Sequence, residues 1–199
     1  MIFAGRQIFV IAPLLLAPVR VSGQCAEPHY RWSEKIDGSL ASITPVRTYV
    51  TTILKSWEPL ELTRAAKYKC WDRAGRELKI YSITGWVRRV RTGESDGDWH
   101  IELTSRQDSP VDSCIVLEIP PPDLNGNFAQ ARVDLRSRAS WDAHGDVEPP
   151  VRARFIGAAF FDGQHRGAEL TNADGSHGRC NSSAKALWEL HPVYWVLGP

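Results

Sequence analysis

The sequence predicts a mainly β protein in which five strands close into one small barrel, in the order β-β-β-α-β-β. Three observations carry this prediction. Several short segments alternate apolar and polar residues, which is the period of a half-buried strand. A single segment between the third and fourth strands has helical spacing instead. Gly85 interrupts the alternation of the first strand, as expected where a long strand bends to close a barrel.

This order of elements, with one helix between strands three and four, is that of an OB-fold. A β-sandwich is the alternative, but it does not account for a single helix at that point. We expect the barrel to occupy residues 76–199. A signal peptide at 1–23 and an N-terminal extension at 24–75 are predicted to precede it.

Residues 1–23 have the parts of a signal peptide. Arg6 precedes an apolar run over 8–19, and small residues follow at 21–23. The run is roughly a dozen residues long, whereas a membrane-spanning helix needs about 20. We therefore expect a secreted or periplasmic protein without a membrane span. A buried N-terminal helix and a lipid anchor on Cys25 are the alternatives.

Without residues 1–23 the chain carries 22 basic and 23 acidic side chains, for a formal charge of −1. Such a balance argues against a protein that binds a bulk polyanion. The outer positions of strands two and three are acidic and nearly free of aromatic residues. They lack the basic groove and stacking platforms that bind single-stranded nucleic acid, so nucleic acid is not an expected partner.

Four cysteines follow the predicted cleavage point, and an even number in an exported chain favours disulfides. The sequence contains no CxxC pair, so a zinc site on close thiolates is not expected. Strands three and five run parallel and adjacent in an OB barrel. Cys114 begins the predicted third strand and Cys180 shortly precedes the fifth. We therefore predict the pairs Cys114–Cys180 and Cys25–Cys70.

In the N-terminal extension, Thr44 followed by Pro45 predicts the start of a short helix. Apolar residues recur at helical spacing as far as Trp57, and Pro59 ends the run. We expect this helix to lie across the outside of the barrel through its apolar stripe, with Tyr49 and Trp57 as packing residues.

The five predicted strands are separated by polar, turn-rich segments. They cover residues 77–90, 98–104, 114–119, 151–161 and 186–197. Asn127 is expected to cap the helix, which runs through Ala139. The segment Asp96-Gly97-Asp98 is interpreted as a turn rather than a metal loop, because no ladder of further ligands follows it.

Polar residues alternate with the apolar positions of strands two, three and five. The alternation places the following side chains on the outer face: His100, Glu102, Glu118, Glu189 and His191. Histidine and carboxylate are suitable ligands for a divalent metal, and they also serve as general acids and bases. The plainer interpretation is that they form hydrogen bonds that hold the last strand. We therefore predict no cofactor and no resident metal, with His100 and His191 as the residues that would bind one.

The loop 162–185 joins strands four and five and is rich in Gly, Asn, Asp and His. Loops at this position line the ligand cleft in many OB-folds. Gln164, His165 and Arg166 offer hydrogen-bond donors there, flanked by glycines. They are the predicted ligand-binding residues, with a plain surface turn as the alternative.

Four motifs stand in order along the predicted barrel. They are Asp96-Gly-Asp-Trp-His100 with Leu103, Leu117-Glu-Ile-Pro120, Gly157-Ala-Ala-Phe-Phe-Asp-Gly-Gln-His165 and Glu189-Leu-His-Pro-Val193. Together they resemble a family of bacterial, mostly exported proteins with DGDxHxxL, EIP, GxxFFD and ELHPV signatures. The resemblance covers residues 77–197, although this chain has Gly163-Gln164-His165 where the family has His-Gly-Gln. It implies an exported OB-like domain and no particular reaction, because the family has no assigned activity.

From these features we expect an exported OB-like domain that binds a small molecule, a glycan or a protein partner through the loop 162–185, without catalysis. The alternative is a divalent-metal-dependent, nuclease-like hydrolase. Its candidate catalytic residues are His100, Glu102, Glu189 and His191.

Overall fold

The structure is a computed structural model that describes residues 27–68, 70–166 and 177–199. The predicted signal peptide, and Cys25 with its alternative role as a lipid anchor, lie outside these residues. None of the helices in the described segments is long and apolar enough to cross a membrane.

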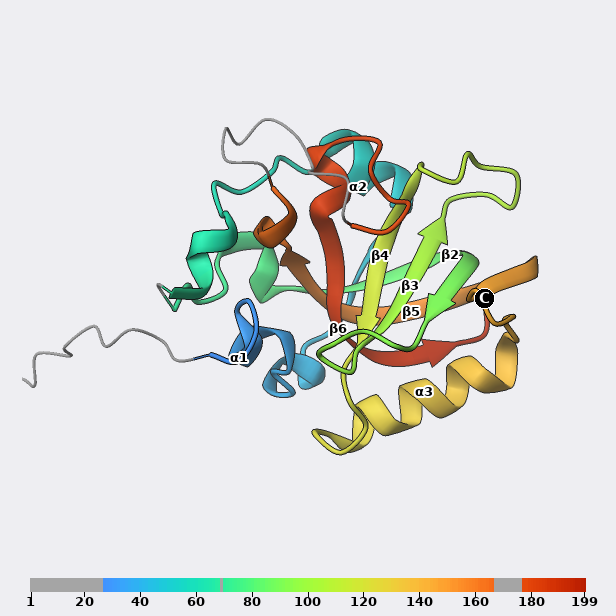
Figure 1. The fold of residues 1–199 in the computed structure, drawn as a ribbon, viewed down its shortest axis with the longest axis horizontal. Coiled ribbons are helices and arrows are strands. Elements are labelled where there is room, and N and C mark those ends of the chain that lie inside the picture. Colours follow the sequence, from blue (N-terminus) through green and yellow to red (C-terminus); the bar gives the residue numbers. More distant parts are fainter. Residues whose placement is uncertain (1–26, 69, 167–176) are drawn as a thin grey trace, which may run out of the picture.

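Five strands form a closed barrel (Figure 1). They are β2 (Ile80–Arg91), β3 (Trp99–Thr104), β4 (Cys114–Ile119), β5 (Asp146–Phe161) and β6 (Trp188–Leu197). The order around the barrel is β2-β3-β4-β6-β5, and β5 pairs with β2 to close it. These pairs are antiparallel except for β4 and β6, which run parallel. The predicted OB-fold-like barrel is therefore confirmed.

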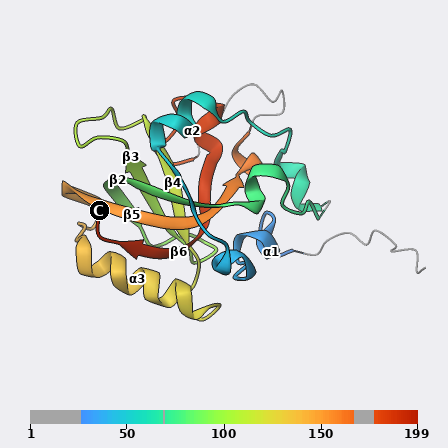
Figure 2. The same ribbon diagram turned by 180° about the vertical axis from the view of Figure 1, so that it is seen from behind.

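The helix α3 (Gly126–Arg138) joins β4 to β5 and packs against β6 (Figures 1 and 2). Its apolar face is buried, as predicted. Its N-cap is Asn125, whose side-chain oxygen accepts a hydrogen bond from the backbone N–H of Asn127 at 2.8 Å. The predicted cap, Asn127, is wrong, because Asn127 already lies inside the helix whereas Asn125 has the extended backbone of a cap residue.

The N-terminal extension contains the short helices α1 (Trp32–Lys35) and α2 (Val50–Ser56) and the strand β1 (Val46–Thr48). The predicted helix start at Thr44 is wrong. The backbone of β1 instead extends the sheet, pairing in parallel with Tyr81–Ile83 of β2. Two of its three residues are β-branched, which suits a strand.

The helix α2 lies on the opposite side of the barrel from α3 (Figure 2). Val50 and Ile53 form its buried face. Trp57 is buried as predicted, and its ring packs edge-on against that of Trp188 at 5.2 Å. Tyr49 was expected to pack as well, but it is 50% exposed. The extension therefore shares one apolar core with the barrel.

The remaining regular elements are short 3-10 helices in the connections. They are η1 (Ser39–Ser42), η2 (Arg64–Tyr68), η3 (Gly75–Leu78), η4 (Gly163–His165) and η5 (Ala184–Leu187). Several strand boundaries differ from the prediction. The first strand begins after η3, and β5 begins at Asp146, before the predicted start at Val151.

Gly85 lies where β2 passes closest to β3. A Cβ atom at this position would lie 2.6 Å from the carbonyl oxygen of Thr104 and 2.7 Å from Cγ of Leu103. The glycine is therefore required by a close approach of two strands, as expected at a barrel bend. The irregularity in strand pairing falls slightly later, between Val87 and Arg89.

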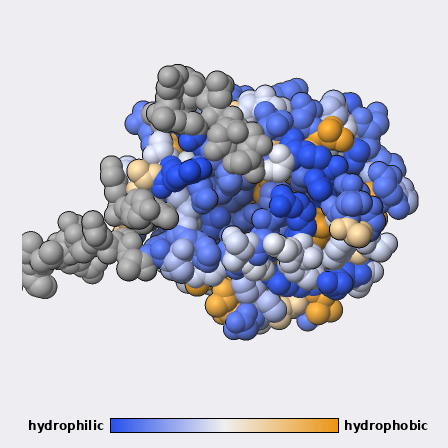
Figure 3. Space-filling view, viewed as in Figure 1, coloured by the Kyte–Doolittle hydropathy of each residue, from blue (hydrophilic) through white to orange (hydrophobic). Residues whose placement is uncertain are grey.

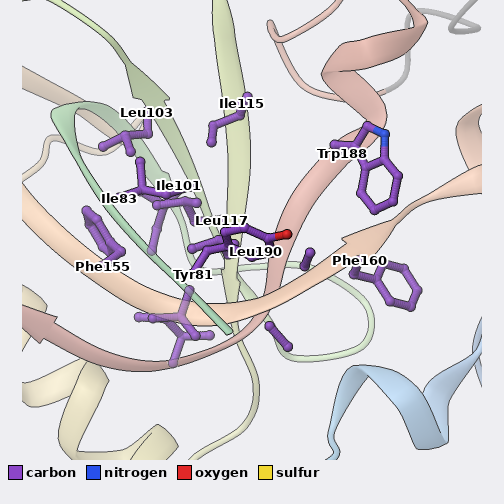
Figure 4. Close-up of a cluster of buried hydrophobic side chains, with 14 of the residues drawn as sticks. Tyr81, Ile83, Ile101, Leu103, Ile115, Leu117, Phe155, Phe160, Trp188 and Leu190 are labelled. Carbon is purple, nitrogen blue, oxygen red and sulfur yellow. The ribbon is translucent and has the colours of Figure 1, made fainter. Parts of the chain in front are cut away.

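The inward side chains of the five strands fill the barrel (Figure 4). They include Ile83, Ile101, Leu103, Ile115, Leu117, Phe155 and Leu190, all 0% exposed. The alternation in the sequence thus assigns the inner face correctly on the strands that it covers.

The disulfide Cys114–Cys180 is present, as predicted. It links the start of β4 to the segment that precedes β6, and these two strands are the parallel neighbours of the barrel. The second predicted pair, Cys25–Cys70, involves Cys25, which lies outside the described residues.

Candidate functional site

The polar residues on the outer face of β3, β4 and β6 are buried rather than exposed. Their exposed fractions are 0% for Glu189 and His191, 1% for Glu102, 5% for His100 and 8% for Glu118. A half-buried sheet facing water on this side was expected, and that expectation is wrong. Other segments of the chain cover this face of the barrel.

Two segments provide the cover. From α1, the ammonium group of Lys35 reaches to 3.8 Å from Glu118. From the segment before β6, Arg179 donates to Glu102 through its side chain at 2.5 Å and through its backbone N–H at 3.0 Å. Since Glu102 is occupied by Arg179, the remaining polar residues form a separate cluster.

His191 lies at the centre of this cluster. Its Nδ1 atom is 2.8 Å from Oε2 of Glu118 and 3.1 Å from Oε1 of Glu189. Its Nε2 atom is 3.2 Å from Oδ2 of Asp98. Two strands, β4 and β6, and the turn before β3 therefore contribute to a single group of charges.

Glu189 connects this group to a second one. Its Oε1 atom faces His191, and its Oε2 atom is 3.1 Å from Nε2 of His177. Asp162, at the end of β5, lies beside them. Its Oδ2 atom is 3.6 Å from the ammonium group of Lys35 and 3.6 Å from Nε2 of His165.

The cluster holds more negative than positive charge. Asp98, Glu118, Asp162 and Glu189 are all buried, and Lys35 is the cation that contacts them. With neutral histidines this leaves an excess of three negative charges. Such an excess is strongly unfavourable in a protein interior unless cations compensate it.

The pKa values of the histidines respond to this excess. Burial alone lowers the pKa of His191, but Asp98 and Glu118 outweigh it and raise that pKa well above its ordinary value. Glu189 likewise raises the pKa of His177 against the effect of burial. Burial raises the pKa of Asp98. The cluster therefore attracts cations, whether protons or metal ions.

Several donor atoms in the cluster have no aligned hydrogen bond. Among the residues that the structure describes, these include both carboxylate oxygens of Asp98, Oε2 of Glu118, Nε2 of His191, Nδ1 of His177 and Nε2 of His100. Some lie close to a neighbour, as Asp98 does to His191, but without the geometry of a hydrogen bond. Buried polar atoms are rarely left unpaired, so these atoms point to a ligand.

Among residues 27–68, 70–166 and 177–199, two sets of three residues have the chemistry and spacing of metal ligands. Asp98, Glu118 and His191 form the first set, and Asp162, His177 and Glu189 form the second. In each set the three donor atoms lie within 4.8 Å of one another. Carboxylate and imidazole together suit Zn²⁺, Mn²⁺ and Fe²⁺.

A polar cleft of about 150 Å³ opens beside the second set. Its walls include Lys35, His100, Glu118, Asp162, His165 and His177, whereas Asp98, Glu189 and His191 lie beneath. A further cavity of about 380 Å³ adjoins it and shares Lys35 and Gln164 with it. The molecular face in Figure 3 is largely hydrophilic, with only scattered apolar residues. A polar ligand fits these surroundings.

The candidates from the outer row do not all lie in one place. His100 is opposite Glu118 in the β3–β4 pairing, and its Nδ1 is 3.3 Å from Oε1 of Glu118. His100 and His191 therefore contact different oxygens of the same carboxylate. Glu189 and His191 belong to the cluster, while Glu102 is held by Arg179 and belongs to neither set of possible metal ligands.

The three predicted ligand-binding residues of the loop also occupy different places. Gln164 and His165 line the cleft. Arg166 instead donates to the backbone carbonyl of Leu60, and its guanidinium lies 5.8 Å from the centre of the Phe161 ring. Arg166 therefore holds the extension against the barrel. Residues 167–176 of the predicted binding loop lie outside the described residues.

Sequence reasoning missed four members of the cluster: Lys35, Asp98, Asp162 and His177. Asp98 was assigned to a turn, and the turn exists, since its backbone N–H donates to Asp96 at 3.2 Å. Continuing the alternation of His100 and Glu102 one step toward the N-terminus would have placed Asp98 on the same face. Lys35, Asp162 and His177 come from irregular segments, where no periodicity marks them.

Comparisons with protein-family models, with curated proteins and with solved structures found no match to this chain.

Proposed function

We propose that this chain is an exported, divalent-metal-dependent hydrolase whose catalytic ion is held by Asp162, His177 and Glu189 at the base of the cleft. The observation that carries the proposal is the position of this set of ligands. Asp162 and His177 belong to the wall of the cleft, so an ion between them would face a bound molecule. Catalytic metal sites typically have three protein ligands and one open position.

The ligand geometry supports this assignment. Nε2 of His177 and Oε2 of Glu189 are 3.1 Å apart, a separation that two donors on one ion adopt. The three side chains are buried, and Lys35 compensates the negative charge around them only in part. A divalent ion here supplies a Lewis acid and lowers the pKa of bound water, which is the usual basis of metal-dependent hydrolysis.

Two further cleft residues supply the remaining functions of a hydrolase. His100 has an unpaired Nε2, and Glu118 holds its ring through Nδ1, which orients the imidazole for proton transfer. Lys35 contributes a fixed positive charge next to Asp162 and Glu118. We therefore expect a small polar substrate, with an anionic group directed at Lys35 and a leaving group near His100.

The location proposed for the chain is secreted or periplasmic. The Cys114–Cys180 disulfide supports it, because disulfides persist mainly in oxidising compartments.

The experiment measures metal content and activity in the same samples. The disulfide-intact chain is loaded with Zn²⁺ or Mn²⁺, desalted and analysed by mass spectrometry. It is then assayed on chromogenic phosphate monoesters, phosphate diesters and carboxylic esters. Asp162→Asn is expected to lose the ion of this site and any hydrolysis, whereas the exposed Asp108→Asn serves as a matched control that retains both.

A chain that binds no divalent ion after loading, and whose properties a chelator leaves unchanged, contradicts the proposal. In that case the cleft, with Gln164 and His165 on its wall, is better explained as the non-catalytic binding site for a small polar ligand.

A further inference from the structure

Of the set Asp98, Glu118 and His191, only Glu118 lines the cleft, whereas Asp162 and His177 of the other set both line it. Asp98 directly precedes β3, Glu118 is on β4 and His191 is on β6, so the three side chains join the three strands on their outer face. Asp98 and His191 are 0% exposed. Neither residue belongs to the wall of the cleft, so the donor atoms that these two residues supply are enclosed by protein.

Four donor atoms of this set lack an aligned hydrogen bond. They are Oδ1 and Oδ2 of Asp98, Oε2 of Glu118 and Nε2 of His191. Carboxylate oxygens and imidazole nitrogens are donors that Zn²⁺ and Mn²⁺ accept in proteins. Oδ2 of Asp98 lies 3.2 Å from Nε2 of His191, but without the geometry of a hydrogen bond, so the desolvation of this buried carboxylate is compensated only in part.

The surroundings of His191 also match those of a metal ligand. Nδ1, the nitrogen away from Asp98, is aligned for a hydrogen bond with Oε1 of Glu189 at 3.1 Å. A carboxylate on the far nitrogen fixes the tautomer and the orientation of a metal-bound histidine. Nε2 is thereby left free to face Asp98, at 3.2 Å from Oδ2.

We infer that this enclosed set holds a second divalent ion, with a structural role, bound by Asp98, Glu118 and His191. The inference rests on the proposed function, because both assume that the cluster binds metal. It concerns a different set of residues. Glu189 links the two sites, because one of its oxygens contacts His177 and the other contacts His191. The enclosed ion would fasten β3, β4 and β6 below the catalytic ion.

Charge supports two ions rather than one. The four carboxylates and Lys35 leave an excess of three negative charges. One divalent ion leaves a buried excess of one negative charge, and two leave one positive charge facing the cleft. The second state suits a site that binds an anionic group.

The test counts ions in the full chain with its disulfide intact. The protein is stripped with a chelator, loaded with Zn²⁺, desalted and analysed for metal per chain, and its melting temperature is recorded before and after loading. We expect about two equivalents in the wild type and about one in Asp98→Asn and in Asp162→Asn. The increase in melting temperature on loading should be mostly lost in Asp98→Asn and mostly kept in Asp162→Asn.

The wild-type count decides the question even if a variant fails to fold. If the wild type binds one equivalent of Zn²⁺, and this ion is lost in Asp162→Asn but kept in Asp98→Asn, the inference is overturned and the proposed function stands. If the single ion is instead lost in Asp98→Asn and kept in Asp162→Asn, the result supports the enclosed site and overturns the catalytic one. No bound Zn²⁺ in the wild type overturns both, and His191 is then a protonated member of an ion-pair network.

Discussion

Glu102 and Arg179 join the barrel to the segment that covers its polar face. Oε2 of Glu102 accepts from the guanidinium of Arg179 at 2.5 Å, and Oε1 accepts from the backbone N–H of the same residue at 3.0 Å. Arg179 also contacts Asp146 at 2.9 Å. Because His177 stands two positions before Arg179, this contact would position a proposed metal ligand without itself taking part in binding.

Arg179→Ala is expected to destabilise the fold. Glu102 is 1% exposed and would keep its charge without a partner, although the partial exposure of Arg179 moderates the effect. We expect a loss of about 2 kcal/mol in the free energy of unfolding, measured by urea denaturation. Arg106→Ala is the matched control. Arg106 pairs with Asp108 at the surface, so its loss should change stability by less than about 0.5 kcal/mol. Equal effects of the two variants would contradict the role assigned to Arg179.

Gly85→Ala should disturb the closure of the barrel. The new methyl group would lie 2.6 Å from the backbone of Thr104 and 2.7 Å from Leu103, so either β2 or β3 must move. We expect a cost of about 3 kcal/mol, seen as a lower urea midpoint. Gly126→Ala tests the same exchange at the first residue of α3, where no atom lies within 4 Å of the added Cβ. That variant should change stability by less than about 0.5 kcal/mol, and a similar loss in both would count against the explanation.

The metal-free chain should lose stability as the pH rises above neutrality. Asp98 and Glu118 raise the pKa of His191 well above its ordinary value of 6.5. A raised folded-state pKa stabilises the fold fully below pH 6.5, and the stabilisation disappears as the pH rises through the folded-state value. Urea denaturation of chelator-treated protein at pH 6.0, 7.5 and 9.0 checks the direction. His191→Gln should flatten the dependence. A stability that increases over this range would contradict the raised pKa.

His100→Gln separates catalysis from metal binding. Gln keeps a polar side chain of similar length but does not exchange a proton near neutral pH. Because His100 lines the cleft and is not one of the proposed metal ligands, we expect metal content to stay unchanged. Hydrolysis should fall by about 10²-fold, the usual effect of removing a general acid or base. If activity is retained, His100 takes no part in proton transfer, and its role is limited to the hydrogen bond with Glu118.

The barrel could be predicted because its inner face follows simple periodicity. Ile101, Leu117 and Leu190 alternate with polar residues, and the OB order then places β4 beside β6, from which the Cys114–Cys180 pair follows. Errors arose where tertiary contacts override local signals. Thr44-Pro45 resembles a helix start, but β1 pairs with the free edge of β2 instead.

The candidate site was only half predictable for a related reason. Alternation shows that His100 and His191 point away from the barrel interior, but it does not show what lies outside. The covering residues Lys35 and His177 come from segments far apart in the sequence, with no periodic pattern. Their place in the cluster depends on long-range contacts such as the Arg179–Glu102 pair and the disulfide.

The Cys114–Cys180 disulfide has a consequence for how the protein matures. Cys180 shortly follows His177, so oxidation of the two thiols anchors the segment that delivers this ligand to Glu189. Oxidation should therefore precede metal uptake. If the proposed metal site is correct, a chain with free thiols should bind metal more weakly than the oxidised chain, so that disulfide formation and metal binding are coupled.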